Sequence, residues 1–234
     1  MRWQVGTHTS SAYWLDTPLC GCYHILHNTG SQLVGWCPPR TPETTRIVIK
    51  DKISLATGVL LVSPPMQWDP NFRRSVVLLC EHSGAGSFGL ILNRSLTVSL
   101  DQLFDDLTAF PEEVGWGGPV QPETLHFVHR EADIIPDSIE IRDGVHWGGD
   151  FDVVREHLAA GIVDPDNIRF FLGYAGWSAG QSQDEVDRGG WIMAHSSEDL
   201  VFDVAEEDLW RQVLRDMGGA YAILANAPDH PSLN

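Results

Sequence analysis

Two apolar segments separated by a short polar turn constrain the fold of this chain more than any other feature. Residues 76–80 (VVLLC) and 88–92 (FGLIL) contain only apolar side chains and glycine, which is typical of strands covered on both faces. Between them lies EHSGAGS, whose glycines and serines favour a turn. We therefore expect a strand pair, antiparallel, at the centre of the fold. A third apolar run over residues 58–62 ends at Pro64 and Pro65, which lack the amide hydrogens that a central strand needs.

The charge of the chain is strongly negative and unevenly distributed. The formal net charge is -17 over 234 residues, and 43% of the residues are hydrophobic, enough for one substantial core. Residues 1–50 hold two acidic and four basic side chains, which leaves 30 acidic and 11 basic ones beyond residue 50. A surface this acidic repels phosphate backbones, so we expect no direct binding to nucleic acid.

Neither a membrane-spanning segment nor a secretion signal is expected. The chain has no run of about 18 apolar residues, and its first thirty residues lack a continuous apolar core. The four cysteines, Cys20, Cys22, Cys37 and Cys80, are too few and too clustered for a disulfide framework. We predict a cytoplasmic protein without a membrane partner.

Both ends of the chain differ in composition from the middle. Residues 1–50 show no sustained hydrophobic period, so we expect either an irregular, disordered extension or a start codon assigned too early. Five side chains there, Cys20, Cys22, His24, His27 and Cys37, are possible zinc ligands, although their spacing is not that of a standard finger. Residues 220–234 are rich in small residues and proline, and a mobile tail is expected there.

The segment between these ends alternates short strands with helices. A helix is expected over residues 99–110, with Ser99 and Gln102 as a capping box and Pro111 after its end. A second helix begins after Asp150 and ends before Gly161. The remaining expected elements are strands at 125–128, 139–141, 144–147, 168–173 and 191–194 and a helix at 208–217.

Several short motifs occur in an order that resembles the YqgE/AlgH family of bacterial proteins. They are GVLLVSPPM from Gly58, D-P-x-F-x-R-S-V from Asp69, Cys80-Glu81-His82, GLILNR ending at Arg94, GGPV from Gly117, LGYAGW from Leu172, and Gly180-Gln181. The resemblance runs from about Ser54 to the helix ending near Met217. We therefore divide the chain into residues 1–50, a YqgE/AlgH-like domain at 51–219, and the tail.

The resemblance implies the fold class and the type of function. It implies one α+β domain with a mixed, largely antiparallel and bifurcated sheet, curled into a pseudo-barrel with helices packed outside. The family takes its name from a proposed role in regulating alginate synthesis. A binding or regulatory role is therefore implied, with no catalytic residue, metal or cofactor, and with an unidentified protein or small molecule as partner.

A catalytic alternative comes from the motif Gly176-Trp177-Ser178-Ala179-Gly180. It matches G-x-S-x-G between an expected strand and an expected helix, the context of a nucleophile elbow. A hydrolase also needs an acid and a histidine downstream, and the orderings that the chain offers are Asp187 with His195 and Asp203 with His230. The upstream glycine-rich loop and the run of βαβ units that such enzymes have are both missing. Ser178 with His195 is thus kept as the alternative catalytic pair.

The preferred site combines two polar pairs at strand ends. Glu81 and His82 end one strand, and Asn93 and Arg94 follow the next, so a hairpin could bring all four side chains to one rim. Arg94 could then bind a carboxylate or phosphate, or His82 could act as a general base oriented by Glu81. Alternatively, Glu81 pairs with Arg94 or Arg74 and only stabilises the turn.

Three further groups of side chains complete the candidate list. Metal binding by His82, His126, His129 and His146 is conceivable, but His126 and His129 belong to opposite faces of a strand. Cys80 ends an apolar run and is expected to be inert. An exposed cluster of Trp68, Trp116 and Trp177 would indicate a binding groove. The residues expected to bind a ligand or partner are Arg74, Glu81, His82, Asn93, Arg94, Trp177 and Gln181.

Overall fold

The central hairpin forms where the apolar pattern predicts it. The computed structural model describes residues 53–104, 107 and 113–228. In it β2 (Val76–Ser83) pairs antiparallel with β3 (Gly86–Ile91), and β1 (Val59–Val62) pairs antiparallel with β2. The apolar residues of β1 and β2 are at most 5% exposed. The prediction of a buried antiparallel pair is confirmed.

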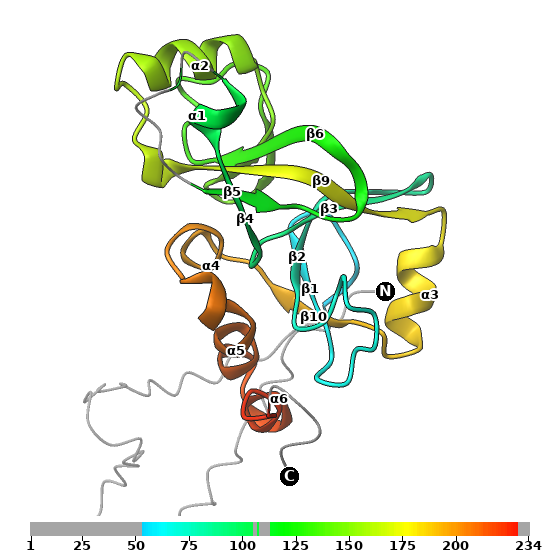
Figure 1. Ribbon diagram of the computed structural model, residues 1–234. Coiled ribbons are helices and arrows are strands. Elements are labelled where there is room, and N and C mark those ends of the chain that lie inside the picture. The colour runs from blue at the N-terminus through cyan, green and yellow to red at the C-terminus, as the bar shows by residue number, and fades with distance from the viewer. Residues whose placement is uncertain (1–52, 105–106, 108–112, 229–234) are drawn as a thin grey trace, which may run out of the picture. The chain divides into compact units, whose positions relative to one another are not determined.

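A ten-stranded mixed sheet surrounds this hairpin (Figure 1). Its main strand order is β10-β1-β2-β3-β9-β6-β8-β7, and β4 pairs with β5, which pairs with β9. The bounds of the remaining strands are β4 (Ser95–Ser99), β5 (Glu113–Trp116), β6 (Val120–His129), β7 (Ile139–Arg142), β8 (Val145–Trp147), β9 (Ile168–Ser178) and β10 (Ile192–His195). The β5–β9 pair is parallel and the others are antiparallel.

The long strand β9 is the point at which the sheet divides. Its second half, residues 175–178, pairs with β3, whereas residues 168–174 pair with β6 and residues 171–172 also pair with β5. Gly118 allows the backbone preceding β6 to touch β9, because a Cβ at that position would lie 2.2 Å from the carbonyl carbon of Tyr174. The sheet also curls, since a Cβ on Gly58 before β1 would lie 2.3 Å from the carbonyl oxygen of Ile141 in β7.

The helices cover three apolar clusters on the sheet. The helices are α1 (Leu100–Leu103), α2 (Phe151–Ala159), α3 (Gln181–Asp187), α4 (Glu198–Phe202), α5 (Glu206–Met217) and α6 (Gly219–Leu224), with a 3-10 turn at Pro165–Asn167. Helices α4 and α5 pack on the face of β1–β3 that carries Leu60 and Leu78. Helices α1 and α2 cover Phe127 and Phe170. Val186 of α3 packs against the cluster formed by Leu61, Trp177 and their neighbours. The fold is thus α+β, with an antiparallel sheet curled into a half-barrel and helices outside it, as expected.

Two expected segments differ from the structure. The helix expected over residues 99–110 ends at Leu103, because Phe104 is extended (φ -138°, ψ 113°), and the Ser99 hydroxyl bonds the Asp101 carboxylate and caps no amide. The tail expected to be mobile from residue 220 instead begins with α6, and Ala225 after it is buried. A helix is favoured there because Leu224, and Ala225 just after the helix, can pack against the core next to α5.

Some sequence expectations fall outside this part of the chain. Residues 1–50, including the cysteines and histidines considered for zinc, lie outside the described residues, as do residues 229–234. Within the described ranges, no helix is long and apolar enough to cross a bilayer.

Candidate functional site

The hairpin separates the two polar pairs that the sequence analysis placed at one rim. Glu81 and His82 pair with Phe88 and Ser87 next to the turn, whereas Asn93 lies at the far end of the hairpin, where its amide oxygen accepts from the Val76 amide at 2.9 Å. His82 lies six positions beyond Val76 along β2, which is about 20 Å of strand. The hypothesis of one four-residue site was wrong, because Glu81 and His82 lie at the end of β2, Asn93 and Arg94 come after the end of β3, and the chain reverses direction between these strands.

The turn end of the hairpin is polar but mainly supports the local fold. His82 Nδ1 lies 2.8 Å from Ser87 Oγ, which lies 2.8 Å from Ser182 Oγ on α3. Ser87 and Ser182 are both buried, so this chain of bonds fastens α3 to the hairpin. Glu81 is exposed at the edge of an open cleft of about 450 Å³, together with Phe88 and other residues.

Ser178 has the local setting of a nucleophile, but within the described ranges no base is bonded to its hydroxyl. It is the last residue of β9, and its hydroxyl donates to the side-chain oxygen of Gln181 at 3.0 Å. The other side-chain bonds near it, from Trp177 and Gln181, go to the Glu185 carboxylate. Gln181 and Trp177 thus hold α3 against the strand end, and the amide of Gln181 cannot activate the hydroxyl.

The histidine considered as its partner lies elsewhere in the sheet. His195 in β10 pairs with Val59 of β1, and β1, β2 and β3 separate β10 from β9. Four strand spacings amount to about 19 Å along the sheet. The catalytic pair of Ser178 and His195 is therefore not assembled.

The far end of the hairpin contributes to a cavity lined by arginines. This cavity of about 380 Å³, which we call the arginine pocket, is lined by Arg73, Arg74, Asn93, Arg94, Glu206, Glu207, Asp208, Trp210 and Arg211. The sequence from residue 53 to residue 228 contains ten arginines and no lysine. Four of those ten arginines line this one cavity.

Backbone carbonyls and indole rings hold two of the guanidinium groups in place. Arg94 donates to the carbonyls of Pro70 and Arg73, both at 3.0 Å, and lies 5.4 Å from the centre of the Trp116 ring. Arg74 lies 4.4 Å above the Trp210 ring. Planar guanidinium groups stacked on aromatic faces are preorganised for carboxylate or phosphate.

Two more contacts shape the same end of the hairpin. Arg74 donates to the carbonyls of Ala227 at 2.8 Å and Pro228 at 2.6 Å, which brings the end of the described chain to the pocket. The side chain of Asn93 donates to the Arg74 carbonyl at 2.8 Å, and Asn93 thereby fixes the backbone around Arg74. Burial lowers the pKa of Arg94, and Asp69 acts in the opposite direction.

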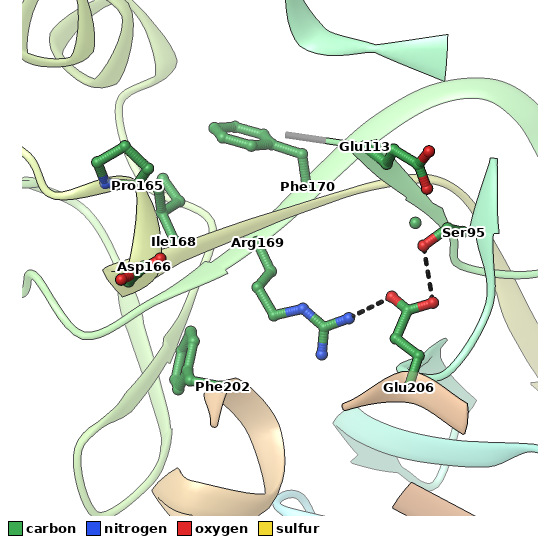
Figure 2. A pocket seen from close by; sticks show the side chains of 10 residues that line it. Ser95, Glu113, Pro165, Asp166, Ile168, Arg169, Phe170, Phe202 and Glu206 are labelled. Carbon is green, nitrogen blue, oxygen red and sulfur yellow. Dashed lines mark hydrogen bonds and ion pairs between the residues drawn. The ribbon is translucent and has the colours of Figure 1, made fainter. Parts of the chain in front are cut away.

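A second cavity, of about 420 Å³, lies next to the arginine pocket and shares Glu206 with it. Figure 2 shows Glu206 between Arg169 and Ser95, and it accepts from both at 2.7 Å. Arg169 also donates to the carbonyls of Leu92 and Val201, both at 2.8 Å. Arg169 therefore joins β9 to the residue that follows β3 and to helices α4 and α5.

Only part of the arginine pocket was predicted from the sequence. Arg74, Asn93 and Arg94 were expected binding residues, whereas Arg73 and Arg211 were not. The Arg73-Arg74 doublet was a visible signal for the first. No local pattern could indicate Arg211, which comes from α5, more than a hundred residues later.

The remaining candidates have less support. Trp177 and Trp68 do not form one exposed cluster with Trp116, because Trp177 is 7% exposed and Trp68 is 85% exposed. Among the described residues, no three or more His, Cys, Asp or Glu side chains converge to hold a metal. Burial raises the pKa of the Cys80 thiol, which keeps it protonated and unreactive.

Comparison with known proteins links the chain to one family. A family model described as AlgH-like matches residues 59–222. A UPF0301 protein of Chlorobium phaeobacteroides is 43% identical over 180 residues, which is 77% of this chain and 96% of that protein. A UPF0301 protein of Cytophaga hutchinsonii is 40% identical over 181 residues, 77% of this chain and all of that protein.

Two solved structures have a similar fold. The solution structure of the AlgH protein of Pseudomonas aeruginosa matches with a TM-score of 0.59 at 27% identity, covering 76% of this chain and 99% of that one. The crystal structure of protein DIP2367 of Corynebacterium diphtheriae matches with a TM-score of 0.66 at 22% identity, covering 75% and 94%.

Proposed function

This chain belongs to the AlgH-like family, and from that premise we propose that it is a binding or regulatory protein without a reaction of its own. It acts by holding an anionic group of its partner, a carboxylate or a phosphate, in the arginine pocket. The observation that carries the proposal is the gathering of four arginines around one cavity of about 380 Å³ in a chain of net charge -17.

Placing like charges together favours an anionic occupant. Four guanidinium groups around one cavity repel one another, and the carboxylates of Glu206, Glu207 and Asp208 at its wall reduce that repulsion. A bound carboxylate or phosphate adds further negative charge and accepts paired hydrogen bonds from a guanidinium group. The rest of the surface is acidic and repels the same ligands, so binding is directed to this one place.

The compartment proposed for this binding is the cytoplasm. Support comes from the composition, because Cys80 is a free thiol in the described core and the cysteines give no disulfide framework.

Titration with a small anion tests the proposal. The full chain is titrated with citrate, and separately with inorganic phosphate, by isothermal calorimetry at low ionic strength. Arg211→Met keeps the helix and removes one pocket charge, and we expect the affinity for citrate to fall about tenfold, as for the loss of a charge-assisted hydrogen bond. Arg188→Met is the matched control, because Arg188, the residue that follows α3, has 80% of its side chain exposed and does not line the pocket.

Two results would contradict the proposal. One is the absence of any saturable binding of citrate or phosphate to the wild-type chain. The other is an equal loss of affinity in Arg211→Met and Arg188→Met, which would indicate attraction by the overall charge only. Raising the salt concentration should weaken true pocket binding gradually, because solvent ions screen exposed charges over about 10 Å at 0.1 M.

A further inference from the structure

The segment between β1 and β2 exposes a tryptophan to a degree that the fold does not require. Trp68 is 85% exposed, the highest value among the large hydrophobic side chains of the described residues, and Met66 nearby is 57% exposed. We call residues 66–72 the Trp68 loop. Large apolar side chains left in water over such a loop indicate a surface that another molecule covers.

The Trp68 loop is ordered by its own hydrogen bonds. The Gln67 amide donates to the Pro64 carbonyl at 3.1 Å, and the Asn71 amide donates to the Asp69 carboxylate at 2.8 Å. Phe72 anchors the end of the loop, packing edge-on against Trp191 with ring centres 5.5 Å apart. Trp68 is therefore displayed on a backbone that is already in place, which reduces the entropy lost on binding.

The Trp68 loop and the arginine pocket are parts of one surface. Arg94 of the pocket donates to the Pro70 carbonyl of the loop, and Arg73, next to Phe72, lines the pocket. Tryptophan, arginine and methionine are the side chains most enriched in the cores of protein interfaces. A small anion bound among the arginines makes no use of Trp68, so the occupant has to extend beyond the pocket.

We propose that the arginine pocket and the Trp68 loop together dock an acidic segment of another protein that carries an apolar side chain beside its carboxylates. The inference rests on the proposed function and assigns its anionic group to a polypeptide. Carboxylates of the segment pair with the arginines, and its apolar side chain packs on Trp68 and Met66. Charge complementarity selects the segment, because the pocket gathers four arginines in a chain of net charge -17.

Two synthetic peptides of about ten residues test this inference. Both carry the same number of acidic residues and a fluorescent label, and they differ only in a central pair of residues, leucine in one and serine in the other. Fluorescence anisotropy with the full chain is expected to show about tenfold tighter binding of the leucine peptide. Trp68→Ser should reduce that ratio to about one and leave the affinity for citrate unchanged.

Control measurements separate the possible outcomes. Ile139→Ser removes another exposed apolar side chain, 53% exposed in β7, and should leave the peptide ratio unchanged. The thermal midpoint of Trp68→Ser should equal that of the wild type, because the side chain is in water. Vesicles of phosphatidylcholine and phosphatidylglycerol should not retain the chain in sedimentation.

The outcomes that overturn the inference are distinct from those that overturn the proposed function. If citrate binds and responds to Arg211→Met but the two peptides bind equally, only the docking inference is wrong. Retention by vesicles that depends on Trp68, without peptide binding, also overturns it in favour of a membrane surface. If neither citrate nor either peptide binds, the proposed function falls as well.

Discussion

Replacing Arg169 by methionine should destabilise the fold more than the same replacement of any other arginine in the described part of the chain. Arg169 makes three hydrogen bonds, to the carbonyls of Leu92 and Val201 and to Glu206, over distances of 2.7 to 2.8 Å. Figure 2 shows the contact with Glu206. Methionine fills similar volume but donates nothing, so the two carbonyls lose this donor and the Glu206 carboxylate keeps the Ser95 hydroxyl. Burial lowers the pKa of Arg169, and the charge and hydrogen bond of Glu206 act in the opposite direction.

The size of the effect follows from the burial of the pair. Breaking a buried ion pair by removing one partner costs about 3–5 kcal/mol. Because 19% of the Arg169 side chain and 27% of the Glu206 side chain are exposed, solvent screens the pair, and we expect the lower end, about 3 kcal/mol. For a chain of this size that corresponds to a fall of about 6–12 °C in the thermal midpoint.

Urea unfolding followed by tryptophan fluorescence measures this loss. Arg188→Met is the matched control, because its ion pair with Asp184 spans 3.9 Å with side chains 80% and 68% exposed and should contribute under about 0.5 kcal/mol. Glu206→Gln keeps an acceptor oxygen for Arg169 and should cost about 1 kcal/mol. A loss in Arg169→Met no larger than that in Arg188→Met would refute the role assigned to Arg169.

Three further predictions concern the sheet and its side chains. Gly118→Ala should destabilise the fold by about 3 kcal/mol or more in urea unfolding, because the new Cβ would lie 2.2 Å from the Tyr174 backbone. Gly148→Ala should cost only about 1 kcal/mol, because the new Cβ would lie in open space. Stability should fall as the pH drops through the ordinary histidine value of 6.5, because burial lowers the pKa of His129 and of His126 and the unfolded chain then binds more protons. His129→Gln should reduce that pH dependence in urea titrations. Ser178→Ala should leave citrate and peptide binding unchanged in calorimetry and anisotropy, since the hydroxyl bonds only Gln181, and a loss of binding would show that this end of β9 belongs to the site.

Elements defined by near neighbours in the chain could be predicted from the sequence. The unbroken apolar run of β2 predicted a buried strand, and Asp150 predicted the start of α2, where its carboxylate accepts from the Asp152 and Val153 amides. These patterns are reliable because strand burial and helix capping depend on residues a few positions apart. The helix expected from Ser99 failed for the opposite reason, since the chain turns extended at Phe104 to pack against Phe151, which lies 47 positions later.

Chemistry that depends on distant segments could not be predicted in the same way. Glu81, His82, Asn93 and Arg94 are all close in sequence, yet the reversal of the chain in the hairpin places the two pairs about 20 Å apart. Ser178 and His195 are only 17 residues apart, but three strands lie between theirs in the sheet. Proximity in sequence was therefore a poor guide to which polar groups share a site.

The amino-acid sequence by itself determined the family, the buried hairpin and the acidic character of this protein, because each is a property of local pattern or of composition. Tertiary structure alone decided that residues 73–74 and 93–94 line one cavity with residues of α5, and that Trp68 stays in water. The physical reason is that side chains meet in a site through the pairing order of strands and the packing of α5 on the sheet. Those arrangements minimise exposed apolar area over the whole domain, and no single segment encodes them.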